Sequence, residues 1–384
     1  MIIRSRRVSL AGGLRPADIS VKDGRIEAVM PYKTACACSQ TLKDWGDKRI
    51  VPGFMDIHTH GGYGFDVDSG DREGLKAWLM ELPGEGVTSV FPTVSTERED
   101  RIKRALANIA KTMAEPYEGA KIQGIHLEGP FIAADFSGAQ PKENILEASV
   151  EKFDELQNSA EGNIKYISLA PEVDREMRLI RHCSANRVRV ALGHTGADYE
   201  TVAMAVSNGA VSMTHVYNAM SSFGHRKPGA VGAALRLKDL YGEIICDCLH
   251  VSPEAINIFF RAKEKGYGIM ISDSLSCKGM EQGSETAFGS ARVAVDENGI
   301  ARLENGTIAG SVLKINEGLR NLVEKCDLPF DVALDSCTIN PARLMGLGDK
   351  KGRIWTGYDA DIVVLNDDYS VEQTYLKGRE AILN

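Results

Sequence analysis

Hydrophobic runs alternate with amphipathic segments through the middle of the chain. The runs are short and almost continuously apolar, which is typical of parallel strands buried on both faces. They span residues 50–58, 87–94, 122–129, 164–172, 187–195, 212–218, 243–250 and 267–274. The intervening segments that predict helices span residues 71–82, 98–113, 176–185, 198–208 and 253–265. Eight such units predict an α/β fold, a (β/α)8 TIM barrel. A doubly wound sheet, the alternative, would need a G-x-G-x-x-G turn after the first strand, which "HTHGGYG" lacks.

The two ends of the chain have a different pattern. Residues 18–31, "DISVKDGRIEAVMP", predict two strands joined by an Asp-Gly turn. The tail holds "GRIWTGYDADIVVLN" and "VEQTYLKGREAIL", which again predict strands and turns without a helix. We expect both ends to form one small β-sandwich (residues 1–52 and 347–384) beside a catalytic barrel (residues 53–346). Two unrelated decorations of the barrel are the alternative.

Composition and charge narrow the class of protein. The chain has 384 residues, of which 43% are apolar and 26% charged, and its net charge of −8 argues against a nucleic-acid binder. The N-terminus lacks a signal-peptide pattern, and no segment approaches the roughly 20 apolar residues of a membrane span. We therefore expect no membrane association. The eight cysteines are scattered and are interpreted as reduced thiols of a cytoplasmic protein, with a metal role for Cys246 or Cys248 as the alternative.

Polar residues concentrate at the ends of the predicted strands. They are His58, His60, Glu128, Glu172, His194, His215, His250 and Asp273. The carboxyl ends of barrel strands surround one mouth, where active sites form. Each of these residues alone could be structural, but five of the chain's eight histidines occupy such positions, which favours a shared site.

The residue types indicate metal-dependent hydrolysis. Imidazole and carboxylate ligands without thiolate suit Zn²⁺ first, with Fe²⁺ or Mn²⁺ as alternatives. Glu128, His194 and His215 predict a three-ligand site with an open position, which is the catalytic pattern. His58 and His60 would complete that site or hold a second ion. Asp273 would exchange a proton with the water that attacks the substrate.

Several motifs together resemble one enzyme family. They are "PGFMDIHTHGGYGFD", "HLEGPFI", "LAPE", "ALGHTGA", "THVYNAM", "CDCLHVSP", "SDS", "AGS" and "NPARLMGLGDKKGRIWTGYDADIVVL". The chain resembles the N-acetylglucosamine-6-phosphate deacetylases, which are metal-dependent amidohydrolases with a barrel and a small β-sandwich. The resemblance runs from about residue 20 to residue 367, and "HLEGPF" and "THVYNAM" are its most specific parts. It implies conversion of N-acetylglucosamine-6-phosphate to glucosamine-6-phosphate and acetate, in amino-sugar catabolism.

The resemblance also assigns roles to residues. It implies that Glu128, His194 and His215 bind a metal, that Asp273 is the general base and acid, and that His58 and His60 allow a second ion, so one or two ions bind. The substrate-contacting positions that it implies are Ala139, Gln140, Asn218, Ala219, Arg226, His250, Ile308 and Ala309. Arg226 would reach the phosphate in the neighbouring subunit, which implies a homodimer. An acidic protein needs such cations to hold a phosphate, although a solvated basic loop would also explain "HRK".

Two residues depart from the family pattern. Gln140 stands where the family has a histidine that assists the acetyl carbonyl, and Cys248 replaces a glycine beside the sugar. An amide can donate a hydrogen bond but carries no charge, so we expect slower turnover or a shifted substrate. The N-acetylgalactosamine epimer or an unphosphorylated sugar is therefore an alternative substrate. A cyclic amidase or deaminase is an alternative enzyme, and a non-catalytic oligomeric scaffold is the alternative to an enzyme.

Overall fold

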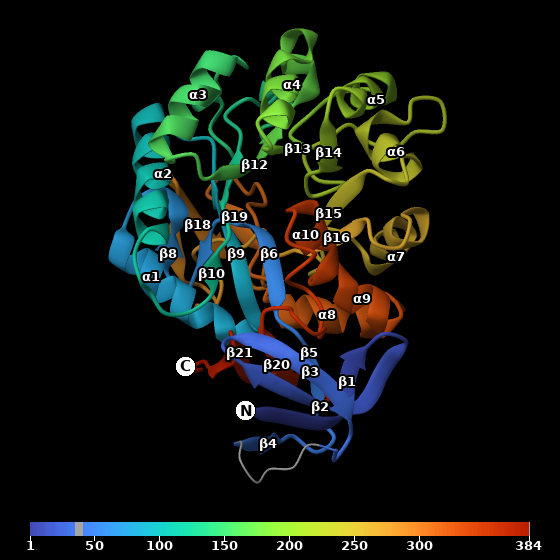
Figure 1. Ribbon diagram of the computed structural model, residues 1–384. Coiled ribbons are helices and arrows are strands. Elements are labelled where there is room, and N and C mark those ends of the chain that lie inside the picture. The colour runs from blue at the N-terminus through green and yellow to red at the C-terminus, as the bar shows by residue number, and fades with distance from the viewer. Residues whose placement is uncertain (35–40, 384) are drawn as a thin grey trace.

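A ring of parallel strands forms the centre of the molecule (Figure 1). The computed structural model describes residues 1–34 and 41–383, so the Cys36/Cys38 pair, which we expect to be reduced, lies outside the described residues. The ring consists of β6 (Phe54–Thr59), β9 (Val87–Val94), β11 (Ile125–Glu128), β12 (Ile164–Leu169), β13 (Arg189–Leu192), β14 (Ala210–Met213), β15 (Tyr241–Ile245) and β16 (Gly268–Ile271). The short strand β10 (Lys121–Ile122) also pairs with β9.

Backbone hydrogen bonds between its first strand and the residues after its last strand close the ring. The Asp273 amide donates to the His58 carbonyl at 2.9 Å, and the His60 amide donates to the Ser274 carbonyl at 2.8 Å. The predicted (β/α)8 barrel is confirmed. The strands end earlier than the apolar pattern predicts, so most of the polar residues lie just beyond the strand ends.

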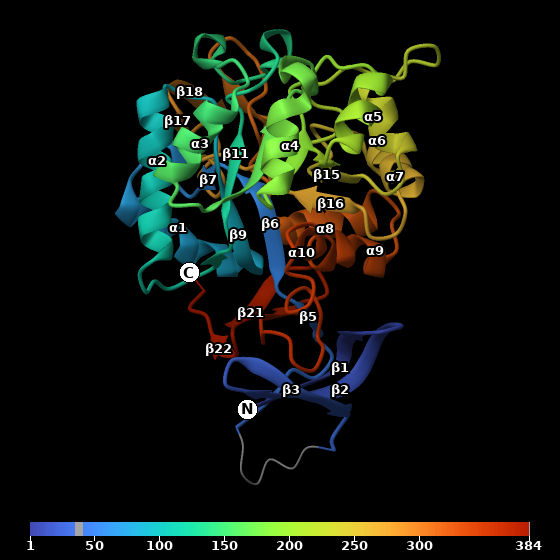
Figure 2. The same ribbon diagram turned by 45° about the horizontal axis from the view of Figure 1, so that its top comes forward.

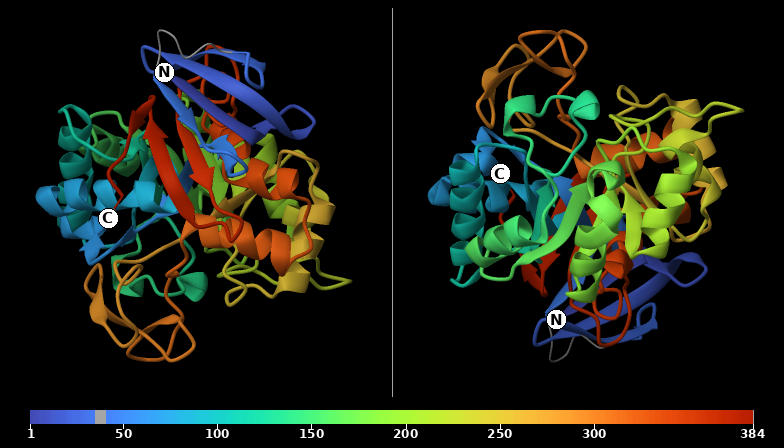
Figure 3. Two further views of the ribbon diagram at one scale, coloured as in Figure 1. Left: turned by 90° about the horizontal axis from the view of Figure 1, so that it is seen from below. Right: turned by 90° about the horizontal axis from the view of Figure 1, so that it is seen from above.

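Helices cover the outside of the ring (Figures 2 and 3). They are α1 (Arg72–Glu81), α2 (Glu99–Met113), α3 (Val150–Ser159), α4 (Arg178–Ala185), α5 (Tyr199–Ser207), α6 (Gly229–Arg236), α7 (Pro253–Ala262), α8 (Ile315–Glu324), α9 (Phe330–Ser336) and α10 (Ile339–Leu344). Short 3-10 turns are η1 (Val67–Ser69), η2 (Leu82–Glu85), η3 (Ala134–Phe136), η4 (Lys142–Asn144), η5 (Pro171–Val173) and η6 (Arg175–Met177). Asp71, Asp198 and Ser252 accept amide hydrogens at the starts of α1, α5 and α7, which fixes where these predicted helices begin.

The two ends of the chain pair into one mixed sheet, which lies below the barrel in the view of Figure 1. Its strands are β1 (Ile2–Leu10), β2 (Gly13–Lys22), β3 (Arg25–Pro31), β4 (Leu42–Asp44), β5 (Arg49–Pro52), β20 (Ile362–Leu365), β21 (Val371–Leu376) and β22 (Arg379–Glu380). Strand β5 pairs with β20, so the sequences of the two termini meet at the centre of the sheet. The expected Asp-Gly turn joins β2 and β3, with φ of 49° at Asp23 and 76° at Gly24.

Alternating residues of β5 and β20 face opposite sides. Ile50 and Ile362 belong to the apolar core of the terminal sheet, whereas Val51 and Val363 join the core of the barrel. The sheet of the termini thus packs on the barrel, and it is not a pair of unrelated decorations. The boundaries at residues 52 and 347 stay a prediction.

A small antiparallel sheet between β16 and α8 was not predicted. It consists of β17 (Glu285–Phe288), β18 (Ala291–Val295) and β19 (Ala301–Leu303), and in both views of Figure 3 this orange insert projects from one side of the barrel. The Asp66 carboxylate accepts from the Gly289 amide at 2.8 Å, and Glu97 accepts from the Ser290 amide at 2.6 Å. These two bonds anchor the β17–β18 turn. Asp66 ends β8 (Phe65–Asp66), which pairs with β7 (Gly61–Gly62).

The structure also bears on the expectation about membranes. Across the described ranges, none of the helices combines the length and the apolar character that crossing a bilayer requires.

Candidate active site

Side chains that follow different strands converge in one pocket at the mouth of the barrel. The pocket is lined by His60, Glu128, Gly138, Ala139, Gln140, His194, His215, Asn218, Ala219, Ile245, His250, Asp273, Leu275, Phe288, Ile308 and Gly310. Most residues that the sequence singled out are therefore brought together, although they come from distant parts of the chain.

Glu128, His194 and His215 form the first group of donors. The Oε1 atom of Glu128 lies 3.2 Å from Nε2 of His194 and 3.0 Å from Nε2 of His215. The two imidazole nitrogens are only 3.1 Å apart. All three side chains are buried.

The backbone after the strands directs these side chains into the pocket. His194, His215 and Asp273 each follow the end of their strand by two residues and have φ of 48°, 25° and 48°. A non-glycine residue with positive φ is strained, and such strain is concentrated at functional sites. The left-handed turn ends each strand and places the functional group at the mouth.

The geometry of the first group fits a bound cation. Nδ1 of His194 lies 2.8 Å from the Phe136 carbonyl oxygen, to which it can only donate, so Nε2 carries a lone pair. That lone pair points toward Nε2 of His215 and Oε1 of Glu128, so three potential ligand atoms face one another at distances that a shared cation would stabilise. Imidazole and carboxylate donors are the ligands that Zn²⁺ and similar divalent ions accept. These three residues could therefore hold a metal ion.

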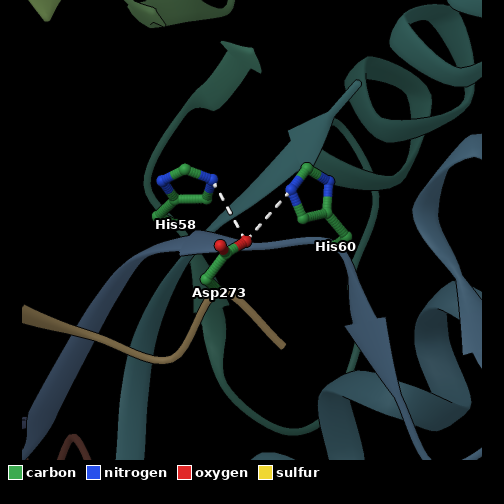
Figure 4. A group of neighbouring side chains, drawn as sticks. All are labelled: His58, His60 and Asp273. Atoms are coloured by element: carbon green, nitrogen blue, oxygen red, sulfur yellow. Dashed lines mark ion pairs between the residues drawn. The ribbon is translucent and has the colours of Figure 1, made fainter. Parts of the chain in front are cut away.

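His58, His60 and Asp273 form a second group (Figure 4). Both histidines come from the end of β6, and Oδ1 of Asp273 lies 3.4 Å from Nε2 of His58 and 3.3 Å from Nε2 of His60. Each of these nitrogens also lies 3.3 Å from a Glu128 oxygen. Glu128 thus lies between the two groups and could serve an ion in either one.

Glu243 is a part of the site that the sequence interpretation missed. It lies on β15 and is fully buried, with Oε2 3.0 Å from Nδ1 of His58 and Oε1 2.5 Å from the Tyr166 hydroxyl. When the His58 ring is neutral, Nδ1 donates to this carboxylate and Nε2 presents its lone pair to the centre. The one available signal was a carboxylate in the otherwise apolar strand "YGEII".

Gln140 has a defined orientation in the pocket. Its Oε1 accepts a hydrogen bond from the Thr96 amide at 3.0 Å. Its Nε2 therefore faces the candidate metal ligands, 2.7 Å from Oε2 of Glu128 and 3.2 Å from Nε2 of His194. Since a backbone amide can only donate, the Thr96 contact fixes which end of the Gln140 amide points into the site.

The electrostatics of the centre favour positive charge. Burial by itself would lower the pKa of His60, but hydrogen bonds to Asp273 and Glu128 raise it to about 10. Burial by itself would raise the pKa of Glu128, but the charges of His58 and His194 lower it well below its usual value. The buried carboxylates thus attract protons to the imidazoles, and a divalent cation would supply the same positive charge.

The residues expected to contact substrate fall into two sets. Ala139, Gln140, Asn218, Ala219, His250 and Ile308 line the pocket. Arg226 and Ala309 do not line the pocket. Arg226 is exposed on the loop before α6, and this loop projects outward in the right view of Figure 3. Ala309 is fully buried beneath the insert. Gly310, the residue after Ala309, lines the pocket in its place. Phe288 of the insert also lines it and packs against His60, with ring centroids 5.1 Å apart.

Other polar residues support the site from outside. Glu172 accepts from the Thr195 hydroxyl at 2.5 Å and from the Gly196 amide at 2.6 Å, which holds the loop that follows His194. His126 lies beneath the site with Nε2 2.8 Å from the Ser168 hydroxyl, and burial together with the charge of His58 lowers its pKa well below the usual range. It stays neutral.

The remaining residues of interest lie elsewhere. His182 pairs with Asp154 at 2.7 Å on the outside of the barrel, as its place in the helical pattern indicated. Among the described residues, neither Cys246 nor Cys248 belongs to a group of three metal-binding donors, so the alternative of a cysteine metal site finds no support there.

Comparisons with known proteins identify the family. The family model described as "Amidohydrolase family" matches residues 49–381. The N-acetylglucosamine-6-phosphate deacetylase of Bacillus subtilis (strain 168) is 38% identical, over 95% of this chain and 93% of that protein. The N-acetylgalactosamine-6-phosphate deacetylase of Escherichia coli O157:H7 is 32% identical, over 99% of both.

A solved structure is similar over the whole chain. It is a mutant N-acetyl-D-glucosamine-6-phosphate deacetylase from Mycobacterium smegmatis in complex with N-acetyl-D-glucosamine-6-phosphate. It has a TM-score of 0.92 and 26% sequence identity, and the match covers 100% of this chain and 99% of that one.

Proposed function

The chain belongs to the amidohydrolase family and, within it, to the N-acetylglucosamine-6-phosphate deacetylases, and from that membership we propose that it hydrolyses N-acetylglucosamine-6-phosphate to glucosamine-6-phosphate and acetate. The observation that carries this proposal is the convergence of Glu128, His194 and His215 beside Asp273 at the barrel mouth. The reaction belongs to the catabolism of amino sugars.

The proposed ligands of the metal are Glu128, His194 and His215, with His58 and His60 available for a second ion. A bound divalent ion polarises the acetyl carbonyl and lowers the pKa of a water molecule. Zinc fits the nitrogen and oxygen donors best, with iron or manganese as alternatives. One or two ions per chain are consistent with the two donor groups, which share Glu128.

Asp273 carries the proton in the proposed reaction. It accepts a proton from the attacking water, and it donates that proton to the amine nitrogen as the carbon–nitrogen bond breaks. The position of Asp273 supports this role. The residue lines the pocket after β16, and its carboxylate faces the candidate metal ligands.

Gln140 stabilises the developing negative charge on the carbonyl oxygen. Its Nε2 group already points into the site, and preorganised donors of this kind lower the barrier of acyl transfer. An amide carries neither a charge nor a transferable proton, so we propose slower turnover than a histidine would give at this position.

The phosphate is bound by His250 and by Arg226 of a second subunit. His250 lines the pocket, and Nδ1 of its ring lies 2.6 Å from the Asp247 carboxylate. Arg226 is exposed and does not line the pocket of its own chain, which suits a contact across a homodimer interface. We also propose a cytoplasmic location, because the described cysteines are free thiols, which persist in a reducing compartment.

A second candidate substrate is the galactosamine epimer. The relative from Escherichia coli O157:H7 is named for N-acetylgalactosamine-6-phosphate. Cys248, which we expected beside the sugar, does not line the pocket, because its thiol packs against Cys326. Ala139, Asn218, Ala219 and Ile308 are the proposed contacts to the sugar. Gly310 takes the place of the buried Ala309.

An acetate-release assay tests the proposed function. The purified enzyme is supplied with zinc and given N-acetylglucosamine-6-phosphate, N-acetylgalactosamine-6-phosphate or N-acetylglucosamine. We expect the highest kcat/KM for the first sugar and at least about tenfold less for the sugar without phosphate. A preference for the galactosamine epimer would establish the second candidate. Release of no acetate from any of them would refute the deacetylase.

A further inference from the structure

Cys248 occupies a strained position in the loop between β15 and α7. Its φ of 63° lies in the left-handed region, which glycine adopts freely and a residue with a side chain adopts at a cost. A thiol at this position therefore comes with backbone strain, and the proposed reaction does not use it.

The strained backbone places the Cys248 thiol against a second thiol. Its Sγ atom lies 4.0 Å from Sγ of Cys326, a residue that is 78 positions away in the sequence and just beyond the end of α8. Cys248 is partly exposed, whereas Cys326 is buried. Cys248 is thus the solvent-exposed member of the pair, and Cys326 is the buried one.

The pair differs from the other described cysteines. Cys183, Cys246, Cys277 and Cys337 are buried, and burial raises the pKa of each. The hydrogen bond with Cys326 lowers the pKa of the Cys248 thiol and raises the pKa of Cys326. A partly exposed thiol with a lowered pKa beside a second thiol is the arrangement of oxidation-sensitive cysteines.

The loop of Cys248 also reaches the substrate pocket. Ile245 and His250, on either side of it in the sequence, both line the pocket. On the other side, the Asn321 side chain on α8 donates to the Cys246 carbonyl at 3.0 Å. A bond between Cys248 and Cys326 would therefore tie a wall of the pocket to α8.

We propose that Cys248 and Cys326 are a redox modification site, in which hydrogen peroxide converts the two thiols into a disulfide that lowers activity. The Cys248 thiolate attacks one peroxide oxygen, the oxygen–oxygen bond breaks, and Cys248 becomes a sulfenic acid while one water leaves. The Cys326 sulfur then attacks the Cys248 sulfur, the sulfur–oxygen bond breaks, and a second water leaves. The two thiols lose two electrons and two protons, and hydrogen peroxide is reduced to two waters.

Disulfide formation must move the pocket wall. The two sulfurs have to approach from 4.0 Å to about 2.05 Å, and the buried Cys326, just beyond the end of α8, moves less than the partly exposed Cys248. The loop of Cys248 is therefore drawn toward α8 and takes His250 with it. Because the metal-binding donors lie on other loops, we expect a higher KM with little change in metal content.

Peptide mapping of the oxidised protein tests the proposal. The protein is loaded with zinc, because peroxide does not oxidise that metal. The protein is treated briefly with hydrogen peroxide, its free thiols are alkylated, and the digest is analysed by mass spectrometry. We expect a cross-link between the Cys248 and Cys326 peptides, and a several-fold rise in KM that dithiothreitol reverses. The Cys326→Ala variant, with Cys183→Ser as matched control, separates the disulfide from other oxidation.

The outcomes divide clearly. Cys326→Ala should keep its KM after peroxide, whereas Cys183→Ser should respond like the unmodified chain. The proposal is overturned if no Cys248–Cys326 cross-link forms, if the cross-link leaves KM unchanged, or if Cys326→Ala responds like the unmodified chain. The cross-link is measured without substrate, so only the KM readout rests on the proposed function.

Discussion

The Nδ1 atom of His58 lies 3.0 Å from Oε2 of Glu243, and both side chains are fully buried. A carboxylate behind a histidine fixes its ring and increases the basicity of the nitrogen that faces a metal. The relationship links β15 to the second group of donors, His58, His60 and Asp273, rather than to the first.

Glu243→Gln should therefore weaken the second metal site selectively. Loss of the buried charge behind His58 should reduce the affinity for the second ion about 10- to 100-fold, while Glu128, His194 and His215 keep theirs. Elemental analysis after dialysis against increasing chelator would show metal content falling toward one ion per chain. Tyr166→Phe, which removes only the other hydrogen bond to Glu243, should have a smaller effect. Equal metal retention in Glu243→Gln and the unmodified protein would contradict the role.

Asp273→Asn should nearly abolish turnover while the metal at Glu128, His194 and His215 persists. An amide at this position cannot accept a proton from water or return one to the amine, which should reduce kcat about 10²- to 10⁴-fold. Acetate release measures the loss, and elemental analysis verifies that the ion expected at Glu128, His194 and His215 is retained. The exposed Asp239→Asn variant provides the control. Near-normal kcat in Asp273→Asn would exclude the proton-carrying role.

Gln140→Ala should lower kcat about 10²-fold, because one preorganised donor to the carbonyl oxygen is lost. KM should change little, since the donor acts mainly on charge that develops in the transition state. Gln140→His should instead raise kcat above that of the unmodified chain. Steady-state kinetics of the two variants decide the point, and a Gln140→Ala enzyme with unchanged kcat would show that the amide is not a catalytic donor.

Arg226→Ala should raise KM about tenfold or more for phosphorylated sugars and leave KM for N-acetylglucosamine unchanged. Mixed dimers test whether the arginine acts across the interface. When Arg226→Ala and Asp273→Asn subunits are combined, the Arg226→Ala subunit keeps its Asp273 and receives Arg226 from its partner. Recovery of activity on mixing would support the contact in the dimer, and no recovery would place Arg226 elsewhere.

Lys263 should make stability depend on pH above neutrality. Burial lowers its pKa from 10.5 to about 8, while its Nζ donates to the Ala234 and Leu237 carbonyls at 3.0 and 2.8 Å. The unfolded chain thus binds more protons than the folded chain between pH 8 and 10.5, so this group makes the free energy of unfolding rise with pH across that window.

Comparison with Lys263→Met isolates the effect. Denaturant unfolding from pH 7.5 to 10.5 should give a rise for the unmodified chain that exceeds the rise for the variant by roughly 1–3 kcal/mol. Parallel pH profiles for the two proteins would show that the Lys263 pKa is not lowered by folding.

Strong local patterns were sufficient for much of the fold. The apolar runs that became β9 and β12 and the amphipathic stretch that became α2 were each predicted, because burial on both faces or on one face leaves a direct record in residue order. Helix α6, "GAVGAALR", was not predicted, because its small residues have no amphipathic period and its helix is fixed by packing. The insert β17–β19 is short and polar outside, and its core forms only when Phe288 meets Leu275.

The candidate site divides in the same way. The sequence alone determined the chemical types, a set of imidazoles and carboxylates at the ends of apolar runs, because metal ligands must be those residues and barrel strands must end at the mouth. Only the tertiary structure decided that Glu128 lies between two donor groups, that Glu243 fixes His58, and that Cys248 meets Cys326. Such contacts join residues tens to hundreds of positions apart, and they depend on backbone turns and side-chain packing that no local pattern records.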